Sequence, residues 1–234
     1  MRLRLPPIAS IRDFYAFEQH VKTCRRQRGL DMTPEWYKVP VFYFSNPAGV
    51  IAHDDPVSGP KNSQALDYEL ELACIIGKAG RDIPEDDRAF DYVAGFTIMN
   101  DWSARDLQRL EMAVGLGPSK GKDFATSLGP ELVTFDELQD RYQDGRLELD
   151  MTARVNDRTL SRGNSKDMYW TWPQLIAHAS RDVWLRPGDV LGSGTVGTGC
   201  ILELTPEAVG GWLKPGDVVE LTIERLGTLR NRVV

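Results

Sequence analysis

Two glutamates lie one residue apart in the segment Leu66-Asp67-Tyr68-Glu69-Leu70-Glu71-Leu72, and their spacing suits metal chemistry. Apolar and acidic side chains alternate through this segment with a period of two, which predicts a β-strand. Successive acids on one face of such a strand lie about 7 Å apart. Parallel carboxylates at that spacing repel each other unless a cation lies between them. A solvated strand face would carry the same pattern, so the alternation alone leaves both interpretations open.

The residues that follow this segment favour a buried site. Ala73-Cys74-Ile75-Ile76-Gly77 is apolar on both faces, which predicts that the strand enters the interior. Glu69 and Glu71 are then expected to point into a pocket. A pocket of carboxylates suggests a hard divalent cation.

Other polar residues could join such a site. Asp101 follows a predicted strand over 93–99, where site residues often emerge, although it could instead cap a helix. Residues 10–28 are predicted to form a helix with Ser10 as its N-cap. On that helix Asp13 and His20 would lie two turns apart on one face. His20 is a candidate base or an ordinary surface or core histidine, whereas the other two histidines are expected to be structural or exposed.

Glycine-rich loops offer two further candidates. The segment from Gly192 to Gly197 matches the G-x-G-x-x-G pattern of dinucleotide-binding loops. Such a loop must open a helix, but residues 200–204 are predicted to form a strand, so we expect no dinucleotide site there. The loop around Lys122 could face an anion or lie on the solvated surface. The basic residues of 22–28 could form a solvated helix face or attract an acidic substrate.

The remaining pattern is mostly strands and tight turns. Strands are expected over 38–44 and 147–156, with a short helix over 84–92 and a longer one over 172–179. Pro-Gly pairs at 187–188 and 215–216 each predict a turn into a strand.

Composition excludes several classes of protein. The chain has 234 residues, 41% hydrophobic and 26% charged, as expected for a globular protein with a substantial core. A net charge of −6 argues against a nucleic-acid-binding protein. No apolar run approaches the roughly 20 residues of a membrane span, and the first residues lack the apolar stretch of a signal peptide. Three cysteines without a C-x-x-C pair favour a reducing cytoplasm over a disulfide framework or a zinc ribbon.

Taken in chain order, several segments resemble the fumarylacetoacetate hydrolase family. The matching segments lie between residues 10 and 230 and are Asp13-Phe14-Tyr15 with His20, Asp67-Tyr68-Glu69-Leu70-Glu71, Asn100 to Gln108, Gly121-Lys122-Asp123-Phe124, Leu185 to Asp189, Gly192-Ser193-Gly194-Thr195 and Leu202-Glu203-Leu204. The resemblance implies an α+β, mostly β fold, a mixed β-sandwich roll of the type found in the C-terminal domain of this family. It also implies a single catalytic domain over 1–234, in which residues 1–30 form an N-terminal helical arm that contributes to the site.

The resemblance also assigns roles to individual residues. It places the metal ligands at Asp13, Glu69, Glu71 and Asp101, an all-oxygen set that suits Mg²⁺ best, with Mn²⁺ or Ca²⁺ possible, and suits Zn²⁺ poorly. It places the general base at His20, the carboxylate partner of that base at Glu203, and a cation beside the metal at Lys122. The substrate-contacting positions that it implies are Tyr15, Gln108, Thr195 and Arg28.

The activity implied is metal-dependent hydrolysis of a C–C bond in a small anionic β-diketo acid, of the fumarylacetoacetate or the acylpyruvate and fumarylpyruvate type. Such reactions belong to the catabolism of aromatic compounds. The resemblance further implies a homodimer, and we expect a cytoplasmic protein without nucleic-acid or membrane partners. An isomerase, decarboxylase or hydratase of a related 2-oxo acid is the alternative, and a non-catalytic metal-stabilised binding protein is the third reading.

The chain departs from the family pattern at three places. We expect no counterpart, within these 234 residues, of the N-terminal β-domain that the larger members carry. Met112 stands where the family has a substrate-contacting tyrosine, and Thr23 stands where acylpyruvase- and decarboxylase-type relatives have a glutamate. These departures leave the acyl group of the substrate open.

Overall fold

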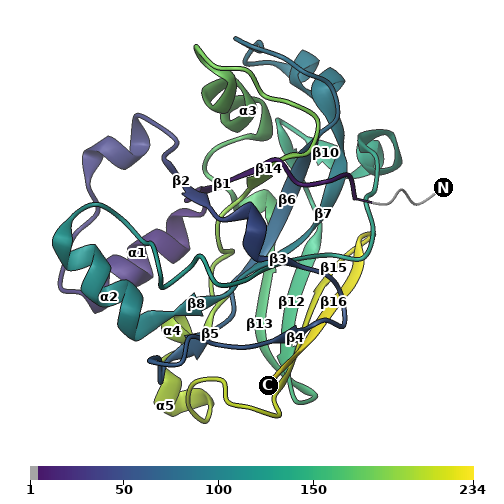
Figure 1. The fold of residues 1–234 in the computed structure, drawn as a ribbon. Coiled ribbons are helices and arrows are strands. Elements are labelled where there is room, and N and C mark those ends of the chain that lie inside the picture. The colour runs from purple at the N-terminus through teal and green to yellow at the C-terminus, as the bar shows by residue number, and fades with distance from the viewer. Residues whose placement is uncertain (1–4) are drawn as a thin grey trace.

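β-Sheets dominate the computed structural model, which describes residues 5–234 (Figure 1). In the described part of the chain the larger sheet has seven strands in the order β2-β1-β14-β6-β7-β9-β3. These strands are β1 (Ser10–Phe14), β2 (Phe42–Ser45), β3 (Val50–Ile51), β6 (Leu70–Ile76), β7 (Val93–Asp101), β9 (Thr126–Leu128) and β14 (Asp189–Gly192). β14 is parallel to β1 and antiparallel to β6, so it joins β1, the second strand from one edge, to β6 at the centre of the sheet.

A second sheet packs against the first. Its order is β13-β12-β15-β16-β4, formed by β4 (Pro56–Val57), β12 (Asp150–Val155), β13 (Arg158–Asn164), β15 (Val218–Ile223) and β16 (Gly227–Val233). β12, β15 and β16 contact β6, β7 and β9 of the larger sheet. Two short ladders complete the sheets, namely β5 (Leu66–Asp67) with β8 (Ser103–Ala104) and β10 (Tyr142–Gln143) with β11 (Arg146–Leu147).

The helices are short and lie around the sheets. The α-helices are α1 (Glu18–Gln27), α2 (Arg105–Val114), α3 (Trp172–Ser180), α4 (Ile201–Leu204) and α5 (Pro206–Val209). The 3₁₀ helices are η1 (Pro34–Tyr37), η2 (Pro47–Gly49), η3 (Asp87–Tyr92), η4 (Phe135–Arg141) and η5 (Ser165–Asp167). α1, α2 and α4 lie together on one side of the sheets (Figure 1). Over residues 5–234, no helix has the length and apolar character needed to cross a membrane.

The alternating residues of β6 divide between two parts of the core. Leu70, Leu72, Cys74 and Ile76 join the large core that also holds the inward side chains of β12 and β15. On the opposite face, Ala73 and Ile75 join a smaller cluster with residues of β1, β7 and β14. Every residue of β6 is buried, because other strands flank it and layers cover both of its faces. The acids at its start are therefore directed into the interior, as the sequence indicated.

The helix predicted over 10–28 is wrong in its first half. Residues 10–14 form β1, with Ser10 paired to Asp189 and not capping a helix, and the helix begins only at Glu18. The segment up to residue 30 is thus a strand followed by a helix, not a helical arm. Residues 10–14 form backbone hydrogen bonds with both β14 and β2, and this tertiary pairing outweighs the local helix propensity on which the prediction rested.

Two further strand predictions also need correction. The segment 38–44 becomes a strand only from Phe42, after η1. The segment 200–204 is the single-turn helix α4, not a strand. The carboxylate of Asp67 accepts hydrogen bonds from the backbone N–H groups of Ile201 (2.8 Å) and Leu202 (3.0 Å), which stabilises the helix start. The strand expected through residues 66–77 is interrupted at Tyr68 and Glu69.

The observed architecture is a mixed, sheet-dominated α+β fold, as the resemblance implied. The finer description as a sandwich roll stays a prediction.

Candidate metal and acid–base site

Four carboxylates converge at one place in the interior. Asp13 comes from β1, Glu69 from the link between β5 and β6, Glu71 from β6, and Asp101 from the end of β7. One oxygen from each lies within 4.8 Å of the others, and all four residues are buried. Glycine at Gly192 in β14 permits this convergence, because a Cβ there would lie 2.5 Å from Oδ1 of Asp13.

Two positively charged side chains, those of Lys122 and Arg105, form ion pairs with part of this acidic cluster. Lys122 Nζ donates to Glu69 Oε2 and to Asp101 Oδ2, both at 2.6 Å. Arg105 forms ion pairs with Asp67 and Glu69, each at 2.8 Å. Burial raises the pKa of Glu69, but the positive charges of Lys122 and Arg105 outweigh burial and leave the pKa below its usual range. Glu69 is therefore ionised at neutral pH.

The other three carboxyl groups are less well compensated. Burial, reinforced for Asp13 by the charge of Asp101 and for Glu71 by that of Asp13, raises their pKa values. Burial also raises the pKa of Asp101, although Lys122 opposes it. One oxygen of each of the three is buried without a hydrogen-bond partner. Because buried oxygens without partners are costly, this set fits a divalent cation that would take them as ligands.

His20 and Glu203 form an acid–base pair at the edge of the cluster. His20 Nδ1 lies 2.7 Å from Glu203 Oε2, which is the contact expected from the resemblance. The backbone N–H of Thr198 donates to the other oxygen of Glu203 at 3.1 Å and fixes the carboxylate. Burial lowers the pKa of His20, but hydrogen bonds with Cys200 and Glu203 raise it to about 10. Without a cation in the carboxylate cluster, these contacts favour the protonated imidazole.

Asp13 and His20 both lie at the cavity, but not for the reason predicted from the sequence. They do not share a helix, because Asp13 lies on β1 and His20 lies on α1. Between them, Ala16 N donates to Ser193 O at 3.1 Å, so the chain turns against the loop after β14 before the helix begins.

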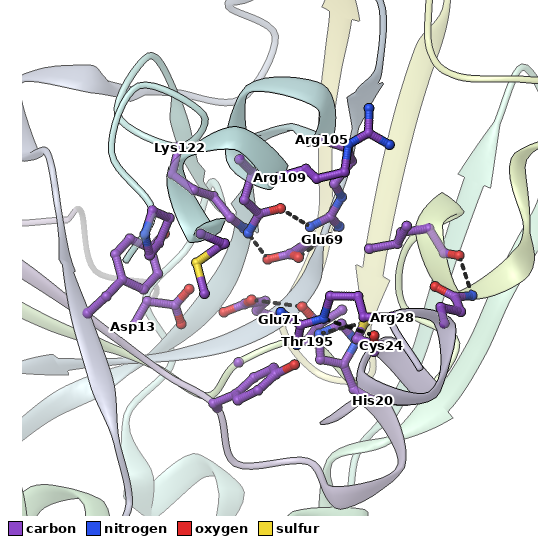
Figure 2. Close-up of a pocket in the computed structure, with 18 of the residues that line it drawn as sticks. Asp13, His20, Cys24, Arg28, Glu69, Glu71, Arg105, Arg109, Lys122 and Thr195 are labelled. Atoms are coloured by element: carbon purple, nitrogen blue, oxygen red, sulfur yellow. Dashed lines mark hydrogen bonds and ion pairs between the residues drawn. The ribbon is translucent and has the colours of Figure 1, made fainter. Parts of the chain in front are cut away.

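A cavity of about 760 Å³ opens onto these groups (Figure 2). It is lined by most of the predicted site residues, namely Asp13, Tyr15, His20, Arg28, Glu69, Glu71, Gln108, Lys122 and Thr195. The two remaining predicted site residues, Asp101 and Glu203, do not line the cavity. Each contacts a residue that does, Asp101 through a hydrogen bond with Lys122 and Glu203 through one with His20. Met112 also lines the cavity, and Arg28 is exposed at its mouth. The structure thus brings all the predicted site residues to one place; their roles stay predictions.

Sequence reasoning assigned no role to Arg105 or Tyr43. Arg105 is buried among the acids, and Tyr43 donates its hydroxyl to Asp101 Oδ2 at 2.5 Å. Arg105 follows Asp101 by four residues inside one of the matching segments, which was a usable signal. Tyr43 carried none, because β2 reaches the site only through its pairing with β1.

Comparison with known proteins identifies the class of protein. The C-terminal domain profile of fumarylacetoacetate hydrolases matches residues 9–234, so the chain belongs to the fumarylacetoacetate hydrolase family. Among curated relatives, the 2,4-didehydro-3-deoxy-L-rhamnonate hydrolase of Sphingomonas sp. is 38% identical over 83% of this chain and 65% of that protein. The mitochondrial oxaloacetate tautomerase of Xenopus laevis is 36% identical over 84% of this chain and 59% of that protein. The chain therefore spans about three fifths of the length of these relatives.

Solved structures agree with this placement. A fumarylacetoacetate hydrolase from Exiguobacterium antarcticum superposes with a TM-score of 0.77 at 30% identity, over 98% of this chain and 76% of that one. A fumarylpyruvate hydrolase from Pseudomonas aeruginosa, solved with Mn²⁺ and pyruvate, also gives 0.77, over 100% and 95% of the two chains. At 24% identity the second likeness shows the fold alone. The relatives are enzymes, and they include both hydrolases and a tautomerase.

Proposed function

We propose that this protein is a divalent-metal-dependent hydrolase that cleaves a C–C bond of a β-diketo acid of the fumarylacetoacetate or acylpyruvate type. The observation that carries the proposal is the His20–Glu203 pair, at 2.7 Å, beside four buried carboxylates in one cavity. A base next to a metal site is what the activation of water beside a chelated diketone requires.

The proposed ligands of the cation are Asp13, Glu69, Glu71 and Asp101. When bound there, a divalent cation would polarise the oxo groups of the substrate and stabilise enolate charge. We place Mg²⁺ first because hard oxygen donors make up the whole set, with Mn²⁺ and Ca²⁺ as the other candidates.

His20 is the proposed base, and Glu203 is the residue that orients it. In its neutral form, His20 accepts a proton from water, and the water oxygen bonds to the carbonyl carbon of the acyl group that is released as the new acid. The C–C bond then breaks, and its electron pair stays with the departing fragment as an enolate. Return of the proton from His20 to the enolate carbon completes the addition of one water. Lys122 lies close enough to the cluster to assist charge stabilisation.

Cationic and polar side chains around the cavity favour an anionic substrate. Arg28 and Gln108 line it together with Tyr15 and Thr195, which are the proposed substrate contacts. Thr195 Oγ1 donates to Glu71 Oε1 at 3.3 Å and links the substrate side to the metal side. The names of the relatives specify small acids with oxo groups, in keeping with this lining.

The test is an assay of small diketo acids with Mg²⁺ or Mn²⁺. Acetylpyruvate, fumarylpyruvate and fumarylacetoacetate would be followed in H₂¹⁸O, with mass analysis of the released acid. We expect one ¹⁸O in the new carboxylate and a loss of roughly 10²–10⁴ in kcat for His20→Ala. Normal turnover by His20→Ala would overturn the mechanism.

A tautomerase of a 2-oxo acid is the second candidate. The raised pKa of His20, about 10, favours it, because a histidine that holds its proton can return it to an enol carbon. Oxaloacetate in D₂O separates the two activities: a tautomerase accelerates exchange of the C3 hydrogens without C–C cleavage, whereas a hydrolase releases a new carboxylic acid.

We further propose that residues 1–234 act as one catalytic domain, that two copies associate as a homodimer, and that the protein works in the cytoplasm. Light scattering coupled to gel filtration tests the oligomeric state, and a monomer in solution would contradict the proposal.

A further inference from the structure

Two buried thiols flank the His20–Glu203 pair, and the proposed hydrolase mechanism uses neither. Cys24 Sγ lies 3.8 Å from His20 Nδ1 and 3.7 Å from Nε2. Cys200 Sγ donates to Glu203 Oε2 at 3.5 Å. Cys24 and Cys200 are both free thiols. One ligand atom each from His20, Cys200 and Glu203 lies within 4.8 Å of the other two, and the Sγ of Cys24 lies beside the imidazole.

The spacing in the chain puts these groups on facing surfaces of two helices. His20 and Cys24 are four residues apart on α1, so they share one face. Cys200 is the N-cap of α4, and Glu203 lies in its first turn. α1 and α4 contact each other. Each of the two segments thus supplies two possible ligands, spaced three or four residues apart. This is the spacing of ligands in tetrahedral zinc sites.

The distances among His20, Cys200 and Glu203 are close to those of a tetrahedral soft-metal site, which Cys24 would complete by moving closer to Cys200 and Glu203. With Zn–S bonds of about 2.3 Å and Zn–N or Zn–O bonds of about 2.0–2.1 Å, the edges of the tetrahedron are roughly 3.3–3.8 Å. The Cys200–Glu203 separation of 3.5 Å and the 3.8 Å from Cys24 Sγ to His20 Nδ1, the nitrogen that faces Glu203, already lie in that range. The His20–Glu203 separation of 2.7 Å must lengthen by roughly half an ångström, which is expected when an ion replaces the shared proton.

We propose that His20, Cys200 and Glu203, with Cys24 moving in as the fourth ligand, form a second metal site, selective for a soft or borderline cation such as Zn²⁺, next to the four-carboxylate site. Thiolate and imidazole ligands select such ions, whereas the carboxylate cluster selects hard ones. His20 and Cys24 line the cavity side by side, which gives an ion access to the site (Figure 2).

Occupation of this site has a consequence for His20. Coordination removes the lone pair that would accept a proton and breaks the contact with Glu203. If His20 is the base of the proposed hydrolase, Zn²⁺ at this site stops turnover even when Mg²⁺ is saturating. Binding itself does not depend on the proposed function.

Co²⁺ is the probe that tests the site, because thiolate-to-cobalt charge transfer absorbs in the near ultraviolet and tetrahedral Co²⁺ absorbs strongly in the visible. Reduced, metal-free protein would be titrated with Co²⁺ and then with Zn²⁺ in the presence of excess Mg²⁺. We expect both absorptions at one equivalent of Co²⁺ and their loss when Zn²⁺ is added.

Matched variants locate the site. Cys200→Ser and Cys24→Ser should each remove or weaken the charge-transfer band and lower Zn²⁺ affinity by about tenfold or more. Cys74→Ser, which changes the third buried thiol far along β6, should keep the band, as should Glu71→Gln in the carboxylate cluster. Absence of the band in the folded wild-type protein overturns the proposal, and so does a band that survives in Cys24→Ser/Cys200→Ser.

Discussion

At the scale of single residues, the site depends on how buried charges are compensated. Lys122 and Arg105 keep Glu69 ionised, while Asp13, Glu71 and Asp101 are left with partnerless oxygens. A cluster with one compensated and three uncompensated carboxyl groups is poised to accept a divalent cation, because the cation removes both repulsion and unmet hydrogen-bonding capacity.

Glu203 should act through His20 and not on the substrate itself. Glu203→Gln keeps the shape of the side chain but removes the charge that favours the imidazolium. We expect a smaller loss of kcat than for His20→Ala, with KM nearly unchanged and the pKa seen in the pH–rate profile shifted down. A kcat loss with no change in the pH–rate profile would assign Glu203 a structural role instead.

The His20–Glu203 pair should also make stability depend on pH. The pKa of His20 in the folded protein, about 10, lies above its ordinary value of 6.5. Its contribution is therefore fully present below about pH 6.5 and is lost as the pH rises through about 10. In metal-free protein, the excess stability of wild type over His20→Gln in urea unfolding should shrink across that range. A constant difference would show that the pair is not charged in the folded state.

At the scale of elements, the strand β14 runs against the carboxylate cluster, and there is no room for a side chain at Gly192. A Cβ at Gly192 would lie 2.3 Å from Met99 Cε and 2.5 Å from Asp13 Oδ1. Gly192→Ala should displace Asp13 and lower divalent-metal affinity by about tenfold or more while the protein still folds. Gly59→Ala is the control, because its added Cβ meets nothing closer than 3.5 Å. Equal metal affinities for the two variants, measured by calorimetric titration, would contradict this account.

The loop from Gly192 to Gly199 should bind no dinucleotide, although for a different reason from the one read in the sequence. A helix does follow the loop, but it has a single turn and the carboxylate of Asp67 already accepts its first N–H groups. A pyrophosphate would meet that negative charge in place of free donors. Saturable binding of NAD at micromolar concentration would show this prediction to be wrong.

At the scale of the whole molecule, a divalent cation should link several parts of the larger sheet. Its proposed ligands come from β1, from the start of β6 and from the end of β7, so binding should stabilise the entire fold. At a free Mn²⁺ concentration of 100 times Kd we expect about 2.7 kcal/mol of added stability, seen as a higher Tm. Glu71→Gln should remove most of this rise and keep a cooperative transition. An unchanged rise in that variant would reject Glu71 as a ligand.

The sequence by itself identified the family and the residues that the structure brings together in one site. Alternation in 66–77 predicted the buried strand, and the ordered motifs predicted the contact between His20 and Glu203, which are 183 residues apart. Those signals are visible because side-chain period and residue type are written locally or repeated across a family.

Tertiary structure alone decided how the residues are presented. Residues 10–14 became a strand because two neighbours pair with them, and residues 201–204 became a helix because Asp67 satisfies its N-terminus. The pairing of Arg105 with Glu69, the approach of Tyr43 to Asp101, and the two thiols beside His20 likewise depend on contacts between distant segments. Such contacts set burial and local charge, and hence the pKa values, and no local pattern of residues encodes them.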